Sequence, residues 1–141
     1  MPNENQSLTN KSIQVTCAII EDSSGNVLVT QRSAAMSLPH KWEFPGGKIE
    51  TGETEEESIV REIGEELNIE ISIIRKLESV THAYPSFTIQ LIPFICGLKN
   101  GEINLTEHQA FNWLNPNDLL SLNLADADIP VVEQYLVTRS E

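Results

Sequence analysis

The stretch that most constrains the fold is residues 44–69, where a glycine-punctuated loop leads into a segment with helical periodicity. Thr54 and Glu57 have the T-x-x-E spacing of a capping box, which predicts a helix that begins at about Thr54. An apolar side chain then recurs at every fourth position, at Ile59, Ile63 and Leu67. This stripe must face a core. Asn68, just beyond it, is expected in the left-handed conformation that ends a helix.

The acidic side chains of this predicted helix are its unusual feature. Between Glu53 and Glu66 the sequence has seven glutamates and one basic residue, Arg61. Glutamates in the first turn complement the helix dipole, but those near the carboxyl end oppose it and repel one another from a shared face. They are Glu62, Glu65 and Glu66. A solvated acidic face would account for this pattern. A bound divalent cation would also account for it, because hard cations take clustered carboxylate oxygens.

The loop and the helix also share a distinctive spacing. Gly47 is followed after five residues by Glu53, and after seven more by the run Arg-Glu-Ile-Gly-Glu-Glu-Leu-Asn-Ile, which begins at Arg61. This spacing resembles the Nudix box of the Nudix hydrolases. Asn68 stands where the family usually has glycine. Asparagine tolerates the left-handed conformation better than most residues, so the departure concerns the cap and leaves the carboxylates unchanged.

The residues before the helix narrow the resemblance. The segment Lys-Trp-Glu-Phe-Pro-Gly-Gly-Lys-Ile-Glu over residues 41–50 looks like the MutT branch of the family, which hydrolyses nucleoside triphosphates. The resemblance implies an α/β fold, the Nudix-type α/β/α sandwich, in which a mixed β-sheet carries the Nudix loop and helix on one side. We expect a single Nudix hydrolase domain over residues 12–141, preceded by a flexible tail over residues 1–11.

The rest of the sequence favours several strands and two further helices. Apolar alternation and β-branched runs predict strands over residues 13–19, 27–29, 71–83, 87–95 and 110–114, the first two forming a hairpin. Pro93 should force a bulge or an edge position on its strand, and Asn100-Gly101 predicts a tight turn. Asn115-Pro116 should begin one helix, and a last helix should cover about residues 128–137.

The resemblance also implies a reaction, in which water attacks a phosphorus of a nucleotide and releases the nucleoside monophosphate and pyrophosphate. Such chemistry needs neutralised phosphates and an oriented water. The expected ligands of Mg²⁺, for which Mn²⁺ should substitute, are Glu62, Glu65, Glu66 and the backbone carbonyl of Gly46. Arg61 should instead pair with Glu53 and hold the glycine loop against the helix.

The general base is open at this level. Candidates within the box are Glu53, Glu65 and Glu66. Glu107 is a candidate outside it, because it lies six residues before Trp113, where the MutT-like pattern has a further glutamate on a loop. An ordinary surface carboxylate is the alternative for Glu107. The histidines lack metal-ligand spacing and are expected at the surface or at strand ends: His40, His82 and His108.

Three residues are candidates for binding the nucleotide itself. By resemblance to MutT-like proteins, Arg32 lies in the nucleotide pocket, and its alternative is an exposed arginine at a strand end. Phe44 is expected to anchor the loop in the core or to flank the base. The resemblance places a base-reading residue at Asp128, whose alternative is a helix N-cap, and Asp126 leaves the register open. A carboxylate here would accept hydrogen bonds from cytosine N4 or from N1 and N2 of guanine.

Charge and cysteine content limit the partners. A net charge of −12 argues against binding of a nucleic acid polymer, and it favours a small nucleotide that arrives as its Mg²⁺ complex. Cys17 and Cys96 lie in apolar runs and indicate buried free thiols in a reducing cytoplasm. No apolar run is long enough to cross a membrane, and no signal peptide is expected. A monomer or a homodimer would fit equally well.

These observations support one leading function. We expect Mg²⁺-dependent hydrolysis of a modified or oxidised nucleoside triphosphate such as 8-oxo-dGTP, or of a cytidine-type nucleotide, to the monophosphate and pyrophosphate. This reaction would clean the nucleotide pool and so serve DNA repair. Two alternatives remain: a Nudix hydrolase of another nucleoside diphosphate derivative, and a nucleotide-binding Nudix domain without catalysis.

Overall fold

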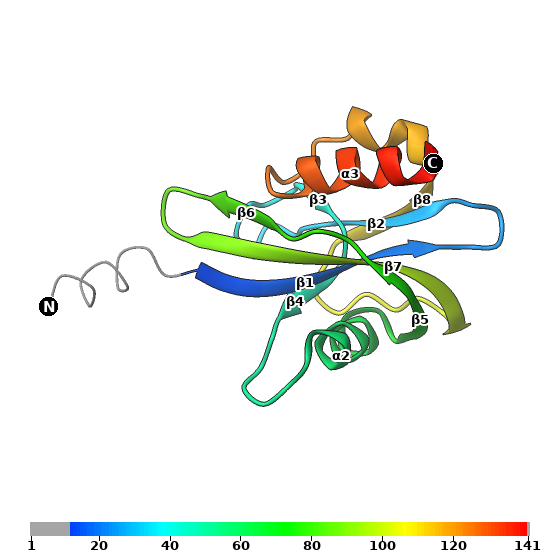
Figure 1. Cartoon of the computed structure of the whole chain (residues 1–141), viewed down its shortest axis with the longest axis horizontal. Helices are drawn as coiled ribbons and strands as arrows, with labels where there is room; N and C mark the ends of the chain where they lie inside the picture. The colour runs from blue at the N-terminus through cyan, green and yellow to red at the C-terminus, as the bar shows by residue number, and fades with distance from the viewer. Residues whose placement is uncertain (1–11, 141) are drawn as a thin grey trace, which may run out of the picture.

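The computed structural model describes residues 12–140, so the tail expected over residues 1–11 lies outside the described residues. In chain order the elements are β1 (Ser12–Glu21), β2 (Val27–Gln31), β3 (Trp42–Glu43), β4 (Gly46–Lys48), α2 (Glu55–Leu67), β5 (Ile69–Lys76), β6 (Val80–Ala83), β7 (Thr88–Gly101), β8 (Ala110–Leu114), the 3-10 helix η1 (Pro116–Ser121) and α3 (Asp128–Ser140). One mixed sheet lies between α2 on one face and α3 with η1 on the other (Figure 1). This layering confirms the expected α/β/α sandwich.

The sheet is built around two long strands that are far apart in the sequence. β1 pairs in parallel with β7 over a continuous register from Ser12↔Thr88 to Glu21↔Gly97, whereas the other strand pairs are antiparallel. The strand order is β3-β2-β1-β7-β5, with β4 beside β1, β6 beside β7 and β8 beside β2. The glycine loop therefore meets the centre of the sheet through β4.

β1 supplies both apolar layers of the core. Cys17 and Ile19 belong to the cluster beneath α3, and Ala18 and Ile20 belong to the cluster beneath α2. Successive side chains of a strand point to opposite faces, so a strand covered by helices on both sides has a continuous apolar sequence. The sheet is thus a rigid platform for whatever lies at its edge.

Helix α2 matches its prediction closely. Thr54 is the N-cap and forms the full capping box with Glu57, and Asn68 ends the helix with φ of 60°. The apolar stripe is completely buried, with Ile59, Ile63 and Leu67 each 0% exposed. The predicted hairpin of β1 and β2 and the predicted strand over residues 110–114 are also confirmed.

The single strand predicted over residues 71–83 is wrong. The chain forms β5 and β6 there, and both pair with β7. The break lies opposite Pro93, whose carbonyl accepts a hydrogen bond from the Leu77 N–H (2.9 Å). Pro93 has no N–H to donate in return, so the ladder stops there. Of the two predicted outcomes for Pro93, the edge position is wrong, because the parallel register with β1 continues through Cys17↔Pro93. The bulge agrees with the pairing, since Lys76↔Phe94 and Val80↔Leu91 leave residues 77–79 opposite residues 92–93.

The other differences concern ends of elements. Asn100-Gly101 does not form the predicted tight turn, because both residues extend β7 and pair with β5. Gly101 is needed for close approach: its φ is +109°, and a Cβ there would lie 2.9 Å from the Asn68 carbonyl oxygen. The helix predicted after Asn115 is a 3-10 helix, and α3 continues to Ser140. None of the helices within residues 12–140 meets the length and hydropathy that a membrane crossing requires.

Candidate active site

The glycine loop brings backbone, rather than side chains, against β1 and α2. A Cβ on Gly46 would lie 1.9 Å from the Thr16 carbonyl oxygen, and a Cβ on Gly47 would lie 2.4 Å from either carboxylate oxygen of Glu62. Both separations are far below van der Waals contact. Gly46 therefore lets the loop backbone lie against β1, and Gly47 lets the Glu62 carboxylate lie directly on the loop backbone.

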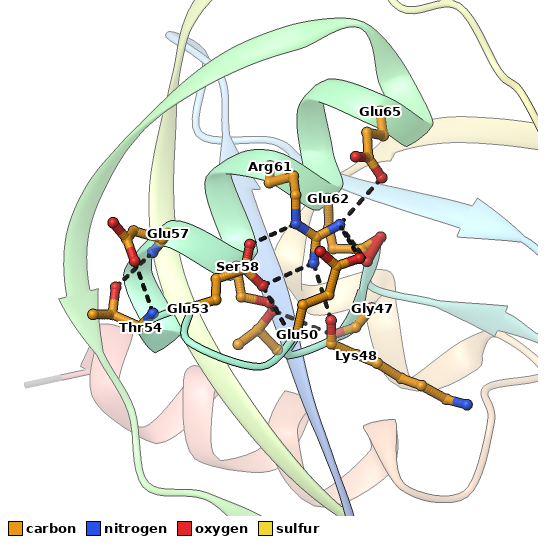
Figure 2. A network of polar contacts seen from close by, with 11 residues as sticks. Gly47, Lys48, Glu50, Glu53, Thr54, Glu57, Ser58, Arg61, Glu62 and Glu65 are labelled. Atoms are coloured by element: carbon orange, nitrogen blue, oxygen red, sulfur yellow. Dashed lines mark hydrogen bonds and ion pairs between the residues drawn. The ribbon is translucent and has the colours of Figure 1, made fainter.

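Arg61 lies at the centre of the polar network that joins this loop to α2 (Figure 2). It donates two hydrogen bonds to Glu53, from Nε to Oε2 (2.6 Å) and from Nη2 to Oε1 (2.9 Å). Nη2 also donates to the carbonyl of Lys48 (3.1 Å). The predicted Arg61–Glu53 pair is thus confirmed. Chiefly because of the Arg61 hydrogen bond, the pKa of Glu53 falls from 4.5 to about 2.

The same guanidinium reaches two of the three carboxylates expected to bind metal. Arg61 Nη1 donates to Glu62 Oε2 (3.1 Å) and to Glu65 Oε1 (3.2 Å). The Glu65 side chain is 62% exposed, whereas that of Glu62 is largely buried against the loop. One cation therefore offsets part of the repulsion that the sequence predicts on this face.

Glu66 is the exception, because none of the ion pairs among residues 12–140 involves its carboxylate. Its Oε1 is buried and has no hydrogen-bond partner within the described chain. Burial, followed by the charges of Glu62 and Glu43, raises the pKa of Glu66 from 4.5 to about 8. A buried acceptor without a partner is costly, so this oxygen favours a ligand that supplies positive charge.

The chemical type of the donors fits a hard divalent cation, although the carboxylate groups do not converge on one point. Over residues 12–140, no three acidic, histidine or cysteine side chains converge closely enough to enclose a metal. Glu62 and Glu65 point to Arg61 instead. All the available donors are oxygens, and the unpartnered oxygen of Glu66 belongs to the same helix face, which suits Mg²⁺ better than a softer metal.

A cavity of about 400 Å³ opens beside the glycine loop, and Gly46 and Gly47 form part of its wall. The side chains that matter for binding in its lining are Arg32, Glu43, Phe44, Tyr84, Phe87 and Asp128. All three residues predicted to contact the nucleotide therefore lie around one space. A mainly apolar cavity with a few convergent polar groups is the usual form of a small-molecule site.

Asp128 faces this cavity, and Asp126 is exposed at the surface. Asp128 is the first residue of α3, but its Oδ2 accepts a hydrogen bond from the backbone N–H of Phe44 (2.8 Å) in place of capping its own helix. Burial, and next the charge of Glu43, hold the pKa of Asp128 well above its ordinary value. Phe44 itself is buried in the core, as one of its two predicted placements requires.

Arg32 is held in place by the cavity wall. Its Nη1 lies 3.0 Å from both carboxylate oxygens of Glu43, and its Nη2 donates to Ser37 Oγ (2.9 Å). Only 18% of the side chain is exposed. Arg32 is therefore not a free surface arginine at a strand end, and its position beside the cavity agrees with the expected one.

The prediction that His108 lies at the surface or a strand end is wrong. Its side chain is 1% exposed, and Nε2 lies 2.8 Å from Glu43 Oε2. Glu43, shared by Arg32 and His108, was not predicted as a site residue. A glutamate between the anchoring aromatics Trp42 and Phe44 was the available signal, because a charged side chain flanked by core residues needs partners. His40 is exposed, and His82 packs edge-on against Tyr84.

Glu107 lies on the loop between β7 and β8 and is exposed. The loop passes the carboxyl end of α2, where the Thr106 N–H donates to the carbonyl of Glu66 (3.3 Å). The charges of Glu43 and Glu107 both contribute to the raised pKa of Glu66. Thr106 is 40 residues from Glu66 in the chain, and the fold thus brings its neighbour Glu107 to the face that carries the expected metal ligands.

Comparison with known proteins gives consistent results. The family model of the NUDIX domain matches residues 11–135. The chain is 36% identical over 130 residues to a CTP pyrophosphohydrolase of Escherichia coli, covering 92% of this chain and 96% of the relative. It is 34% identical over 125 residues to an 8-oxo-dGTP diphosphatase of the same species, covering 86% and 95%. The crystal structure of a MutT protein from Methanosarcina mazei superposes with a TM-score of 0.85 at 23% identity, covering 94% and 98%, and supports the fold.

Proposed function

The chain belongs to the Nudix hydrolase family, and from this we propose that it hydrolyses a nucleoside triphosphate to the monophosphate and pyrophosphate with Mg²⁺ as cofactor. One observation carries the proposal: the cavity lined by Arg32 and Asp128 opens onto the Gly46–Gly47 loop, which rests on the carboxylate of Glu62. A base in the cavity would therefore direct its phosphates toward α2.

The polar groups of the cavity support a substrate base that presents amine or amide hydrogens. Asp128 Oδ2 already accepts from the Phe44 N–H, which leaves Oδ1 for a ligand. Cytosine offers its N4 amine, and guanine or its 8-oxo form offers N1–H and the N2 amine. The two relatives are named for CTP and for 8-oxo-dGTP, so we propose these two bases as the leading candidates.

Mg²⁺, with Mn²⁺ as a substitute, would be held by Glu62, Glu65, Glu66 and the carbonyl of Gly46. When bound, the metal neutralises charge on the phosphates and polarises the bond that breaks. The protein supplies the rest. Arg61 stays on Glu53 and keeps the glycine loop in register with α2, so that the phosphates meet a fixed surface.

Of the candidate bases, we propose Glu107. Glu53 is a poor proton acceptor because Arg61 lowers its pKa to about 2. Glu65 and Glu66 are needed as metal ligands in this scheme. Glu107 is exposed, lies on the adjoining loop and is near enough to affect Glu66. It would take a proton from the attacking water as the new phosphorus–oxygen bond forms and the bridging bond to pyrophosphate breaks.

We also propose that this activity removes unwanted nucleotides from the pool of a reducing compartment, the cytoplasm. Cys17 and Cys96 are both free and buried, as a reducing environment allows.

The test is a substrate panel scored by kcat/KM with Mg²⁺ present. CTP, dCTP, dGTP, 8-oxo-dGTP and a nucleoside diphosphate sugar should be compared, with release of pyrophosphate measured directly. We expect at least one triphosphate to exceed the sugar derivative by about 100-fold or more, a difference of about 2.7 kcal/mol in transition-state binding. Turnover of the sugar derivative alone would favour the first alternative function. Binding without turnover of any member would favour the second.

A further inference from the structure

The two residues that flank Glu107 in the chain are both anchored, although Glu107 itself is exposed. On the amino-terminal side, the Thr106 N–H donates to the Glu66 carbonyl (3.3 Å) and Thr106 Oγ1 to the same oxygen (3.4 Å). Two residues earlier, the Asn104 N–H donates to the carbonyl of Leu67 (2.9 Å). This half of the loop is therefore fastened to the end of α2.

On the carboxyl-terminal side, the anchors belong to β2 and β3. His108 Nε2 lies 2.8 Å from Glu43 Oε2 in a position shielded from solvent. The next residue, Gln109, donates from its N–H to the Gln31 carbonyl (3.0 Å) and from Nε2 to Gln31 Oε1 (2.9 Å). Glu107 is the exposed point of a loop held at both ends.

We propose that His108 is a positioning residue for the reaction: its hydrogen bond to Glu43 fixes the second half of this loop and so holds Glu107 beside the attacking water. This inference rests on the proposed role of Glu107 as general base. A histidine that only filled space would not need a carboxylate partner at 2.8 Å, and a buried hydrogen bond of this kind is directional.

The anchor on the other side of this bond is stiff. Glu43 is fixed by Arg32, which approaches both of its carboxylate oxygens at 3.0 Å. Glu43 also belongs to β3, which pairs with β2 through Thr30↔Glu43. Because Arg32 lines the nucleotide cavity, the same carboxylate joins the base-binding side to the loop that carries the proposed base.

The surroundings of the second ring nitrogen, Nδ1, indicate which nitrogen of His108 carries the hydrogen. Nδ1 is buried and has no partner in the described chain. The neutral ring with its hydrogen on Nε2 fits this site, since it donates to Glu43 and leaves only an acceptor unpaired. A hydrogen on Nδ1 would be a buried donor without an acceptor, which costs more. The role therefore requires a neutral donor, which a glutamine amide can also supply.

The test combines kinetics with matched variants. We expect His108→Leu to lower kcat by about 10- to 100-fold with KM within about threefold of wild type, because displacing a reacting group by an ångström costs rates of this order. His108→Gln should restore most of kcat. Glu107→Gln and the double variant with His108→Leu should have the same kcat, because one residue acts through the other. Ile19→Val, a buried position in the cluster beneath α3, on which none of residues 102–109 packs, controls for a fall in Tm.

Two kinetic results would overturn the proposal. One is additive loss of kcat in the double variant, and the other is an equal loss of kcat in Ile19→Val at a matched Tm. Amide hydrogen exchange over residues 102–109 gives a readout that needs no turnover: His108→Leu should exchange faster there and His108→Gln should not. Should the wild type hydrolyse no triphosphate, the proposed function fails, and unchanged exchange in His108→Leu would separately refute the anchoring by His108.

Discussion

The carboxylate network around Arg61 and the nucleotide cavity meet at Gly47, yet they are built in opposite ways. The carboxylates that pair with Arg61 come from one loop and one helix, and all of them lie within residues 50–65 (Figure 2). The cavity takes its wall from β1, β3, the β6–β7 hairpin and the start of α3. Ion pairs hold the side chains of the network in place, whereas buried packing shapes the wall of the cavity.

This difference separates two tasks. A network whose parts are adjacent in sequence can keep one fixed chemistry, because its geometry depends on a single loop–helix unit. A cavity assembled from distant segments can change its selectivity by one substitution without disturbing that unit. Asp128 and Arg32 should then govern which nucleotide reacts, and Glu62, Glu65 and Glu66 should govern whether any nucleotide reacts.

The largest expected effect is on the network side. Exhaustive chelation of divalent ions should abolish turnover of every substrate alike, since the carboxylates then face only Arg61, and added Mg²⁺ should restore it. Steady-state rates before and after EDTA treatment measure this. Turnover that persists in EDTA would show that the reaction does not need the metal. Loss of turnover for some substrates only would contradict the separation between a network that controls the reaction and a cavity that selects the substrate.

Next in size are single carboxylates of α2. Glu65→Gln and Glu66→Gln should each lower kcat by about 10² to 10³, the scale for losing a catalytic electrostatic group, while the fold stays intact. Glu56→Gln is the matched control, because Glu56 is an exposed glutamate of the first turn of the same helix. Variants that melt earlier but retain their rate would show these residues to be structural.

A smaller and more selective effect belongs to the cavity. In Asp128→Asn one amide oxygen can still accept from Phe44, but an NH₂ group then faces the ligand. A base with two donors should lose about 1–3 kcal/mol, roughly 5- to 150-fold in kcat/KM, and the ranking across the panel should change. Asp128→Ala should weaken every preferred substrate. An unchanged ranking in Asp128→Asn would move base recognition to another residue of the cavity.

The smallest effect is on stability and concerns Glu66 in the metal-free protein. Its folded pKa, about 8, is above its ordinary value of 4.5, so its contribution favours the fold below pH 4.5 and is lost as the pH rises toward 8. Glu66→Gln should therefore gain in Tm over wild type between pH 5 and 8 in EDTA. Differential scanning fluorimetry measures this, and a gain independent of pH would contradict the assigned cause. Excess Mg²⁺ should reduce the difference.

The network was predictable from the sequence because its rules are local. The capping box of Thr54, the apolar stripe of α2 and the Arg61–Glu53 pair follow from spacing along one helix and its loop. His108 could not be predicted in the same way. Its burial depends on Glu43, 65 residues away, and no period in either segment indicates that contact. The break between β5 and β6 was missed for a similar reason, since its cause, Pro93, is in the partner strand.

The parallel pairing of β1 with β7 has a consequence for how the protein folds. Side chains joined across this pair, such as Gln14 and Gln90, are 76 residues apart. Closing so long a loop costs entropy before any contact rewards it, so folding should be slow, in about the millisecond-to-second range of proteins with many distant contacts. During synthesis, β1 cannot pair with β7 until the chain has been made as far as β7. The capping residues of α2, Thr54 and Asn68, are instead adjacent to that helix in the sequence. The cavity also needs Asp128 at the start of α3, so its wall is complete only after that residue has been synthesised.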